Sequence, residues 1–102
     1  MVKRWFTDLY ADSRHEVWTG CRISCCDDDE WLIVRTGVRM GPLDEAIVDW
    51  YLSTGESVGK AGGYGIQGQA SVLVAGLDGS LSNVIGLPVL EVRDVLKRLG
   101  VL

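Results

Sequence analysis

The side chains best suited to chemistry lie in a glycine-rich stretch at positions 55–68, which holds 6 of the chain's 13 glycines. Because glycine has no side chain, the backbone N–H groups of such a stretch can approach a ligand closely and surround an anion. Lys60 carries a compact positive charge on a long stem, which suits a phosphate group. Gln67 has two donors and an acceptor, so it can read the edge of a base or orient a water molecule. A solvated surface lysine and a turn amide bonded to its own backbone are the alternative interpretations.

Two nucleotide-binding motifs nearly match this stretch, and neither has the surroundings it needs. Positions 55–60 read G-x-x-x-G-K, one residue shorter than a P-loop, and Ala61 stands where a P-loop needs Ser or Thr for magnesium. Positions 63–68 read G-x-G-x-x-G, the dinucleotide fingerprint, which must leave a strand and open a helix. Here the elements are expected in the reverse order, a helix before the stretch and a strand after it. We therefore discount both motifs.

Hydrophobic periodicity predicts the elements around the glycine-rich stretch. Helices are expected at 3–11, from Pro42 to Gly55 and at 88–99, and strands at 16–25, 32–39 and 71–77. The acidic run at 27–30 is predicted to be the turn of an antiparallel hairpin. The order helix, strand, strand, helix, loop, strand, helix predicts a mixed α/β fold, with a partly antiparallel sheet flanked by helices.

The same periodicity predicts which side chains share a face. In the first two helices the apolar stripes are Trp5, Phe6, Leu9 and Tyr10, and Leu43, Ala46, Ile47, Trp50 and Tyr51. In the last helix the stripe is Val89, Val92, Leu96 and Leu99. In the first strand Val17, Thr19, Cys21, Ile23 and Cys25 face one way, opposite Trp18, Arg22 and Ser24. Each element is therefore expected to pack on one side only.

Length and composition describe one domain of ordinary globular character, covering residues 1–102. Hydrophobic residues make up 47% of the chain and charged residues 24%. The net charge of −4 argues against binding to nucleic acid, which uses clustered Lys and Arg. No apolar run approaches the ~20 residues that span a bilayer. Asp8 stands where a signal peptide would be apolar, so no membrane association and a cytoplasmic location are expected.

The cysteines and acids do not form the pattern of a metal site or a disulfide framework. Cys21, Cys25 and Cys26 are odd in number and closely spaced, unlike the cysteines of a secreted domain. Zinc needs about four ligands, and only His15 could join these three. We therefore predict no metal ligand in this chain, and the acidic run 27–30 is interpreted as a solvated turn.

Four ordered sequence blocks resemble the Maf family, the septum-formation-inhibitor-like proteins. They are H-E-V-W-T-G at 15–20, W-Y-L-S-T-G-E at 50–56, G-K-A-G-G-Y-G-I-Q-G at 59–68 and G-S-L-S-N-V-I-G-L-P at 79–88. Together they run through most of residues 9–99. Ser57 and Gly59 depart from the family pattern, in which a proline and an acid are usual.

The resemblance implies a nucleoside triphosphate pyrophosphatase, which cleaves between the α- and β-phosphates with a divalent metal such as Mg²⁺ or Mn²⁺. The I-Q-G form at 66–68 is similar to the branch that acts on dTTP and UTP. By the same resemblance, Gln67 stands at the position that contributes to nucleotide selectivity, and Lys60 has a phosphate-facing or loop-ordering role. His15 matches a family strand and is expected to be structural.

The resemblance also implies that part of the machinery lies elsewhere. The family's S-x-R-R motif, its A-D-T segment with the proposed general base and its G-K-P lysine do not occur in residues 1–102. We therefore expect the C-terminal part of a Maf-like fold, with no catalytic residue and no carboxylate metal ligand of its own. Activity would need an N-terminal half, in the same gene or in trans.

Two other functions stay open at this point. The chain could be a non-catalytic module that binds nucleotides. It could also be a dimerisation module in which Trp5, Phe6 and Tyr10 cover another chain's apolar surface. A chain of this length holds a core with little to spare, so exposed apolar surface is expected as well.

Overall fold

The structure is a computed structural model that describes residues 2–25 and 27–102. Its elements are α1 Val2–Arg4, η1 Trp5–Tyr10, β1 Arg14–Cys25, β2 Asp28–Met40, α2 Glu45–Ser53, η2 Gln69–Val72, β3 Val74–Asp78, α3 Leu81–Ile85 and α4 Val89–Arg98. The three strands form one antiparallel sheet in the order β1-β2-β3. The predicted mixed α/β class, with helices beside the sheet, is confirmed.

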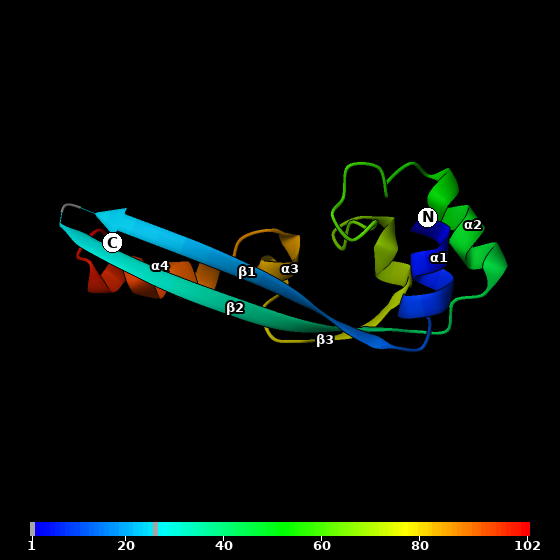
Figure 1. Ribbon diagram of the computed structural model, residues 1–102, viewed down its shortest axis with the longest axis horizontal. Helices are drawn as coiled ribbons and strands as arrows, with labels where there is room; N and C mark the ends of the chain where they lie inside the picture. The colour runs from blue at the N-terminus through cyan, green and yellow to red at the C-terminus, as the bar shows by residue number, and fades with distance from the viewer. Residues whose placement is uncertain (1, 26) are drawn as a thin grey trace.

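The molecule has two parts of different shape (Figure 1). The part called the lobe here gathers α1, η1, α2, the glycine-rich loop and η2 at one end. The part called the ribbon is the long β1–β2 hairpin with α3 and α4. The molecule measures 53 × 23 × 19 Å, and its radius of gyration is 16.3 Å, against about 13 Å for a compact chain of this length. The chain is elongated because the hairpin extends well beyond the lobe.

The N-terminal helical segment fills the centre of the lobe. It spans residues 2–10, close to its expected bounds, and widens into π-type turns in η1. Phe6 is fully buried, and its ring meets the ring of Tyr51 edge-on at 5.6 Å. The hypothesis that Trp5, Phe6 and Tyr10 cover another chain is therefore wrong for Phe6, because this ring belongs to the chain's own core.

The hairpin pairs along its whole length, from Arg14 opposite Arg39 to Cys25 opposite Asp28. Its side chains alternate between a half-buried inner face and an exposed outer face, as the period of two predicts. Val17 and the other odd-numbered positions of β1 point inward, and the even-numbered positions point outward.

The acidic run 27–30 differs from the prediction of a solvated turn. Strand β2 begins at Asp28, so only one of the four acids precedes the strand. Asp29 accepts hydrogen bonds from Nε and Nη2 of Arg22 across the hairpin, both at 2.9 Å. The opposite charge across the strands lets the pairing continue almost to the tip. Cys26, one of the three closely spaced cysteines, lies outside the described residues.

Helix α2 begins at Glu45, later than the predicted start at Pro42. The reason is the side chain of Asp44, whose Oδ1 accepts the N–H of Ile47 at 2.8 Å. This hydrogen bond satisfies one of the backbone N–H donors of the first turn, which have no partner within the helix. It therefore sets the N-terminal boundary of the helix.

The buried side of α2 also differs from the prediction. Val48 and Tyr51 are fully buried, whereas Ile47 and Trp50 of the predicted stripe are exposed. Apolar residues occur on both flanks of this helix, so the position of its neighbours decides which flank is covered. Leu43, just before the helix, is buried as expected.

The chain after the glycine-rich loop enters the sheet later than predicted. Residues 69–72 form the 3₁₀ turn η2, and β3 covers only Val74–Asp78. Helix α3 is too short for periodicity to predict. It is capped by Ser80, whose Oγ accepts the N–H of Asn83 at 3.1 Å.

Asn83 fastens α3 to the inner face of the hairpin. It is fully buried, and its Nδ2 lies 3.1 Å from Val17 O, 3.2 Å from Val34 O and 3.2 Å from Thr36 Oγ1. The last helix, α4, matches the expected helix at 88–99. It lies behind the hairpin in Figure 1, and Arg98 contacts Glu30 of β2 at 2.9 Å.

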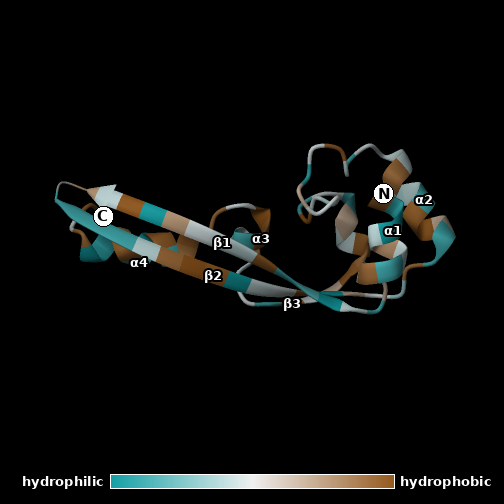
Figure 2. Ribbon diagram, in the orientation of Figure 1, coloured by the Kyte–Doolittle hydropathy of each residue, from teal (hydrophilic) through white to brown (hydrophobic). Residues whose placement is uncertain are grey.

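Buried apolar side chains gather in the lobe and at its junction with the sheet. They are Phe6, Val38, Met40, Leu43, Val48, Tyr51, Tyr64, Ala70 and Leu73. None of the described residues between 14 and 35 reaches full burial. The hydrophobic residues of this part of the hairpin, brown on the ribbon of Figure 2, are therefore only partly covered. In the described part of the chain, no helix has the length and hydrophobicity to cross a membrane.

Candidate functional site

A pocket of about 500 Å³ lies at the junction of the lobe and the ribbon. Residues 59–68 of the glycine-rich loop form one wall, and Val17 and Thr19 of β1 form another. Residues 83–86, at the end of α3, complete it. The loop and α3 face each other across this junction in Figure 1. The volume is in the range of sites that hold a small molecule or cofactor.

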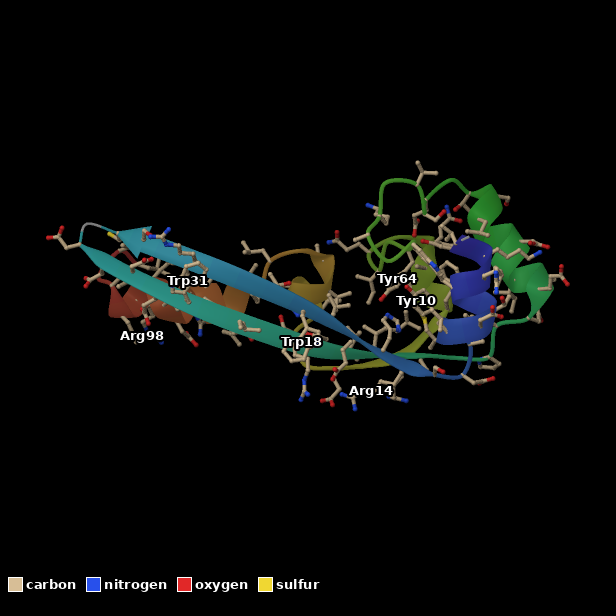
Figure 3. The ribbon with its side chains drawn as sticks, in the orientation of Figure 1. Tyr10, Arg14, Trp18, Trp31, Tyr64 and Arg98 are labelled. Carbon is tan, nitrogen blue, oxygen red and sulfur yellow. The ribbon has the colours of Figure 1, made fainter. Side chains whose placement is uncertain are left out.

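The glycine-rich loop rests on aromatic side chains of the lobe. Tyr10 Oη donates a hydrogen bond of 2.8 Å to Gly62 O. Gly63 has a φ of +84°, and a Cβ there would lie 2.9 Å from Val2 Cγ1. Tyr64 is buried with its ring edge-on to Tyr10 at 5.8 Å, and the two lie close together in Figure 3. Close packing and the positive φ therefore require glycine at position 63.

His15 contacts Tyr64 of the glycine-rich loop and Tyr10, which packs against that loop. Its Nε2 lies 2.6 Å from Tyr64 Oη, and its ring stacks on Tyr10 at 4.5 Å. Burial lowers the pKa of His15 and raises the pKa of Tyr64, so both side chains are neutral at pH 7. This arrangement agrees with the structural role expected for His15.

Glu56 braces the far end of the loop. Its Oε1 accepts hydrogen bonds from Tyr51 Oη at 2.7 Å and from the N–H of Ala70 at 3.2 Å. Its Oε2 accepts the N–H of Gln69 at 2.8 Å. A Cβ at Gly68 would overlap the carboxylate of Glu56. Glycine at 68 therefore lets one carboxylate reach across the loop and hold its backbone.

The electrostatics of this brace keep Glu56 ionised. The hydrogen bond from Tyr51, followed by that from the backbone of Gln69, holds the pKa of Glu56 below its usual value. Burial, with the hydrogen bond to Glu56 as a second cause, raises the pKa of Tyr51 to about 12. Tyr51 Oη also accepts the N–H of Gly65 at 3.0 Å. A neutral tyrosine and an ionised carboxylate thus hold the two ends of the segment 65–70.

The structure brings Lys60 and Gln67, the two residues singled out from the sequence, into the same pocket. Both are exposed, and neither side chain makes a hydrogen bond or ion pair with any described residue. The backbone N–H groups of Ile66 and Gln67 likewise donate to no described residue. The wall therefore offers a cation, an amide and backbone donors to a ligand. The alternative of a turn amide bonded to its own backbone is not what the structure shows.

The two near-miss motifs have the surroundings that the sequence predicts. Positions 55–60 follow helix α2 rather than a strand, and positions 63–68 lead into the short turn η2 rather than a long helix. Neither stretch leads into the N-terminus of an α-helix, which is where both motifs bind phosphate. The discounting of both motifs is confirmed.

The described lining of the pocket has few groups for catalysis or metal binding. Glu56 is its one carboxylate, and its oxygens already accept three hydrogen bonds. No group of three or more His, Cys, Asp and Glu among residues 2–25 and 27–102 could hold a metal ion. Mg²⁺ and Mn²⁺ favour carboxylate and other oxygen ligands. The described residues therefore do not fit the divalent metal that the resemblance implies.

The sequence pattern assigns no role to Glu56 or Tyr51, although both prove to shape the site. A signal for Glu56 does exist. It is an acid placed directly before a stretch with many backbone donors and few side-chain acceptors. A carboxylate in that position is well placed to accept hydrogen bonds from the loop.

Fold and pocket together define a mixed α/β protein with a pocket lined by a glycine-rich loop. The chain matches the family model described as Maf-like protein over residues 3–99. This chain belongs to the Maf family.

Individual relatives agree with this assignment. A protein of Anaeromyxobacter sp. (strain Fw109-5) named dTTP/UTP pyrophosphatase is 44% identical over 97 residues, covering 88% of this chain and 46% of that protein. Proteins with the same name from Myxococcus xanthus (strain DK1622) and Sphingopyxis alaskensis (strain DSM 13593 / LMG 18877 / RB2256) are 44% and 43% identical over 86 and 94 residues. These matches cover 84% and 91% of this chain, and 43% and 50% of those proteins. The chain spans about half the length of the curated relatives it matches.

Proposed function

We propose that this chain supplies the nucleotide-selecting wall of a nucleoside triphosphate pyrophosphatase that acts on dTTP or UTP in the cytoplasm. The observation that carries the proposal is the placement of Lys60 and Gln67 in one pocket, with side chains that no described residue engages. The printed names of the relatives support the same substrate class. Residues 1–102 would form the C-terminal region of the enzyme, and the catalytic base and metal ligands would come from an N-terminal half.

The chemistry of a pyrimidine base fits Gln67. Uracil and thymine present an N–H donor beside a carbonyl acceptor, and the Gln67 amide presents an acceptor beside a donor. Lys60 supplies a point charge for the phosphates, and the free N–H groups of Ile66 and Gln67 add donors nearby. The brace at Glu56 keeps these groups on one rigid wall, which reduces the entropy lost on binding.

Binding tests this role directly. We expect calorimetry to show that UTP and dTTP bind the chain, and that Gln67→Ala weakens UTP binding about tenfold, the loss of one or two hydrogen bonds. The matched control is Gln69→Ala, because Gln69 is exposed but does not line the pocket. An unchanged affinity in Gln67→Ala, or an equal loss in the control, would contradict the selecting role.

Lys60 is tested by comparing ligands of different charge. Lys60→Ala should weaken UTP binding more than uridine binding, because only the triphosphate uses the cation. Lys97→Ala, an exposed lysine in α4, is the control. An equal effect on UTP and uridine would show that Lys60 orders the loop instead of meeting the phosphates.

Catalysis is tested with the chain alone and with a matching N-terminal half. We expect UTP hydrolysis to monophosphate and pyrophosphate, with Mg²⁺ or Mn²⁺, only when both parts are present. Robust turnover by this chain alone would contradict the statement that the base lies elsewhere.

A second candidate, a non-catalytic nucleotide-binding module, is favoured by one observation. The only carboxylate among the described pocket residues, Glu56, is committed to three hydrogen bonds. UTP binding without hydrolysis, even with the N-terminal half added, would support this candidate over the first.

A further inference from the structure

The outer face of the hairpin carries the same pattern on both strands. Positions 16–22 of β1 read E-x-W-x-G-x-R, and positions 29–35 of β2 read D-x-W-x-I-x-R. In each strand the named positions are two apart, so their side chains share one face. Acid, tryptophan, a small or apolar residue and arginine thus follow in the same order on two neighbouring strands.

The pairing of the strands turns this repeat into a face with approximate two-fold symmetry. Three neighbouring pairs carry it, and they are Trp18 with Arg35, Gly20 with Ile33, and Arg22 with Trp31. The guanidinium carbons of Arg35 and Arg22 lie 5.8 and 5.5 Å from the ring centres of their tryptophans. The pair of Gly20 and Ile33 is the centre of this pattern. Because the strands are antiparallel, the tryptophan lies on β1 in the pair on one side of the centre and on β2 in the pair on the other side.

This face is exposed to solvent. Trp18, Trp31 and Ile33 are 59, 73 and 72% exposed, and the two tryptophans lie at separate points along the hairpin in Figure 3. At Gly20, a Cβ would meet no atom within 4 Å, so a space opens beside Ile33. The helix α3 and the pocket belong to the opposite face, which carries Val17 and Thr19.

The two arginines are held in place by acids on the face itself. Arg22 Nη2 lies 2.9 Å from Asp29 Oδ2, and Arg35 Nη1 lies 3.4 Å from Glu16 Oε2. Both side chains are therefore positioned before any partner arrives, which reduces the entropy lost on association.

We propose that this outer face binds a second copy of the chain, face to face, about a two-fold axis parallel to the strands. Such an axis places each strand over the other strand of the partner. Trp18 then meets the partner's Arg35, Arg22 meets the partner's Trp31, and Ile33 enters the space over the partner's Gly20. Each cation faces an aromatic ring and each protruding side chain faces a gap, so the face is complementary to itself in charge and shape.

The gap at Gly20 selects this axis over the other way of stacking two copies. An axis that runs across the strands would also place arginine over tryptophan. It would, however, set Ile33 against the partner's Ile33 and leave the space at Gly20 empty. The proposed axis fills that space, and it leaves the pocket on the opposite face open to solvent.

Sedimentation of the whole chain over a range of concentrations tests the proposal. We expect a reversible monomer–dimer equilibrium, and we expect Gly20→Val to raise its dissociation constant at least about tenfold by filling the gap that Ile33 needs. In the monomer the valine side chain meets open space, and valine is a residue type that suits a strand. The fold of Gly20→Val is therefore expected to be retained. Ile33→Lys should have an equal or larger effect, and Val58→Lys, 81% exposed in the lobe, should have none.

Two outcomes would overturn the proposal. One is a wild-type chain that stays monomeric up to about 1 mM, a limit beyond which association is too weak to be specific. The other is a dimer whose dissociation constant is the same in Gly20→Val and Ile33→Lys, which would assign it to another surface, such as the exposed apolar residues of α3 and α4. Circular dichroism confirms the fold of each variant. UTP binding is measured separately and should not change in Gly20→Val, so failure of the nucleotide proposal and failure of this one are distinguishable.

Discussion

The lobe and the ribbon use apolar side chains in opposite ways. In the lobe, Phe6, Val48 and Tyr51 are fully buried around one core. In the ribbon, Trp31 and Ile33 remain exposed, and the hairpin is held by backbone pairing and cross-strand charges. The lobe is therefore stabilised by burial, whereas the outer face of the ribbon presents its side chains to solvent.

The difference matters for the pocket, because the pocket takes one wall from each part. The glycine-rich loop belongs to the lobe, and Val17, Thr19 and residues 83–86 belong to the ribbon. The relative position of the walls depends on the few groups that join the parts, among them Asn83 and the contact of His15 with Tyr64. Substitutions in the lobe, at the joint and in the ribbon should therefore differ in both size and kind of effect.

The largest effect is expected for Phe6→Ala in the lobe. Removing a fully buried ring leaves a cavity, and we expect the free energy of unfolding to fall by about 3–5 kcal/mol in urea denaturation. Leu9→Ala, at an exposed position of the same helical segment, should change it by no more than about 0.5 kcal/mol. Similar losses in both variants would show that the lobe has no specific core.

A smaller effect is expected at the joint, in Asn83→Ala. The substitution removes the buried hydrogen bonds to Val17 O, Val34 O and Thr36 Oγ1, and we expect a loss of roughly 2–3 kcal/mol. Leu81→Ala, at an exposed position of the same helix, is the control. Because Asn83 also lines the pocket, weaker UTP binding in Asn83→Ala at a temperature where it stays folded would show that this residue contributes to the nucleotide site. An unchanged stability would contradict the fastening role of Asn83.

The next effect is the pH dependence that comes from Glu56. Because folding lowers the pKa of this carboxyl, its contribution is complete above the unfolded value of about 4.3 and is lost as the pH falls through the folded value. Glu56→Gln should therefore lose less stability than the wild type when the pH falls from 5 towards 3. Tyr51→Phe removes the largest cause of the low pKa, so its acid-linked loss should be smaller than that of the wild type and should be complete at a higher pH. Identical acid profiles for all three proteins would contradict the brace.

The smallest effect is expected on the outer face of the ribbon. Ile33→Thr keeps a β-branched side chain at an exposed strand position, and it should change the unfolding free energy by no more than about 0.5 kcal/mol when measured on monomer. Val38→Thr, on the same strand but fully buried, should lose about 1–3 kcal/mol because its hydroxyl enters the core. Equal losses at the two positions would remove the distinction between ribbon and core.

The parts of the fold that follow from local rules are predictable from the sequence. The alternation along β1 and β2 is correct because the pleat of a strand fixes which side chains share a face, whatever lies nearby. The acidic run at 27–30 is misassigned because its place in the strand depends on contacts outside the run, with Arg22 across the hairpin and with Arg98, which lies 68 residues from Glu30. The stripe of α2 is partly wrong because both flanks of that helix are apolar, and only its neighbours choose between them.

The same division applies to the site. Lys60 and Gln67 can be singled out by residue type and by a loop that is too rich in glycine to be regular. Their placement on one wall opposite β1 and α3 cannot be predicted, because it depends on contacts made across the whole chain. The roles of Glu56 and Asn83 are likewise invisible without the fold, since their hydrogen-bond partners include backbone groups 14 and 66 residues away.

The sequence by itself therefore determined the faces of the hairpin, the glycine-rich loop, its two polar side chains and the resemblance to the Maf family. These depend on residue type and on spacings of a few residues, and local backbone geometry is enough to interpret them. Only the tertiary structure decided that the loop is braced by Glu56, that the pocket spans the lobe and the ribbon, and that the tryptophans of the hairpin stay exposed. Each of these depends on which distant segments pack together, because packing decides which polar groups find partners and which apolar faces remain uncovered.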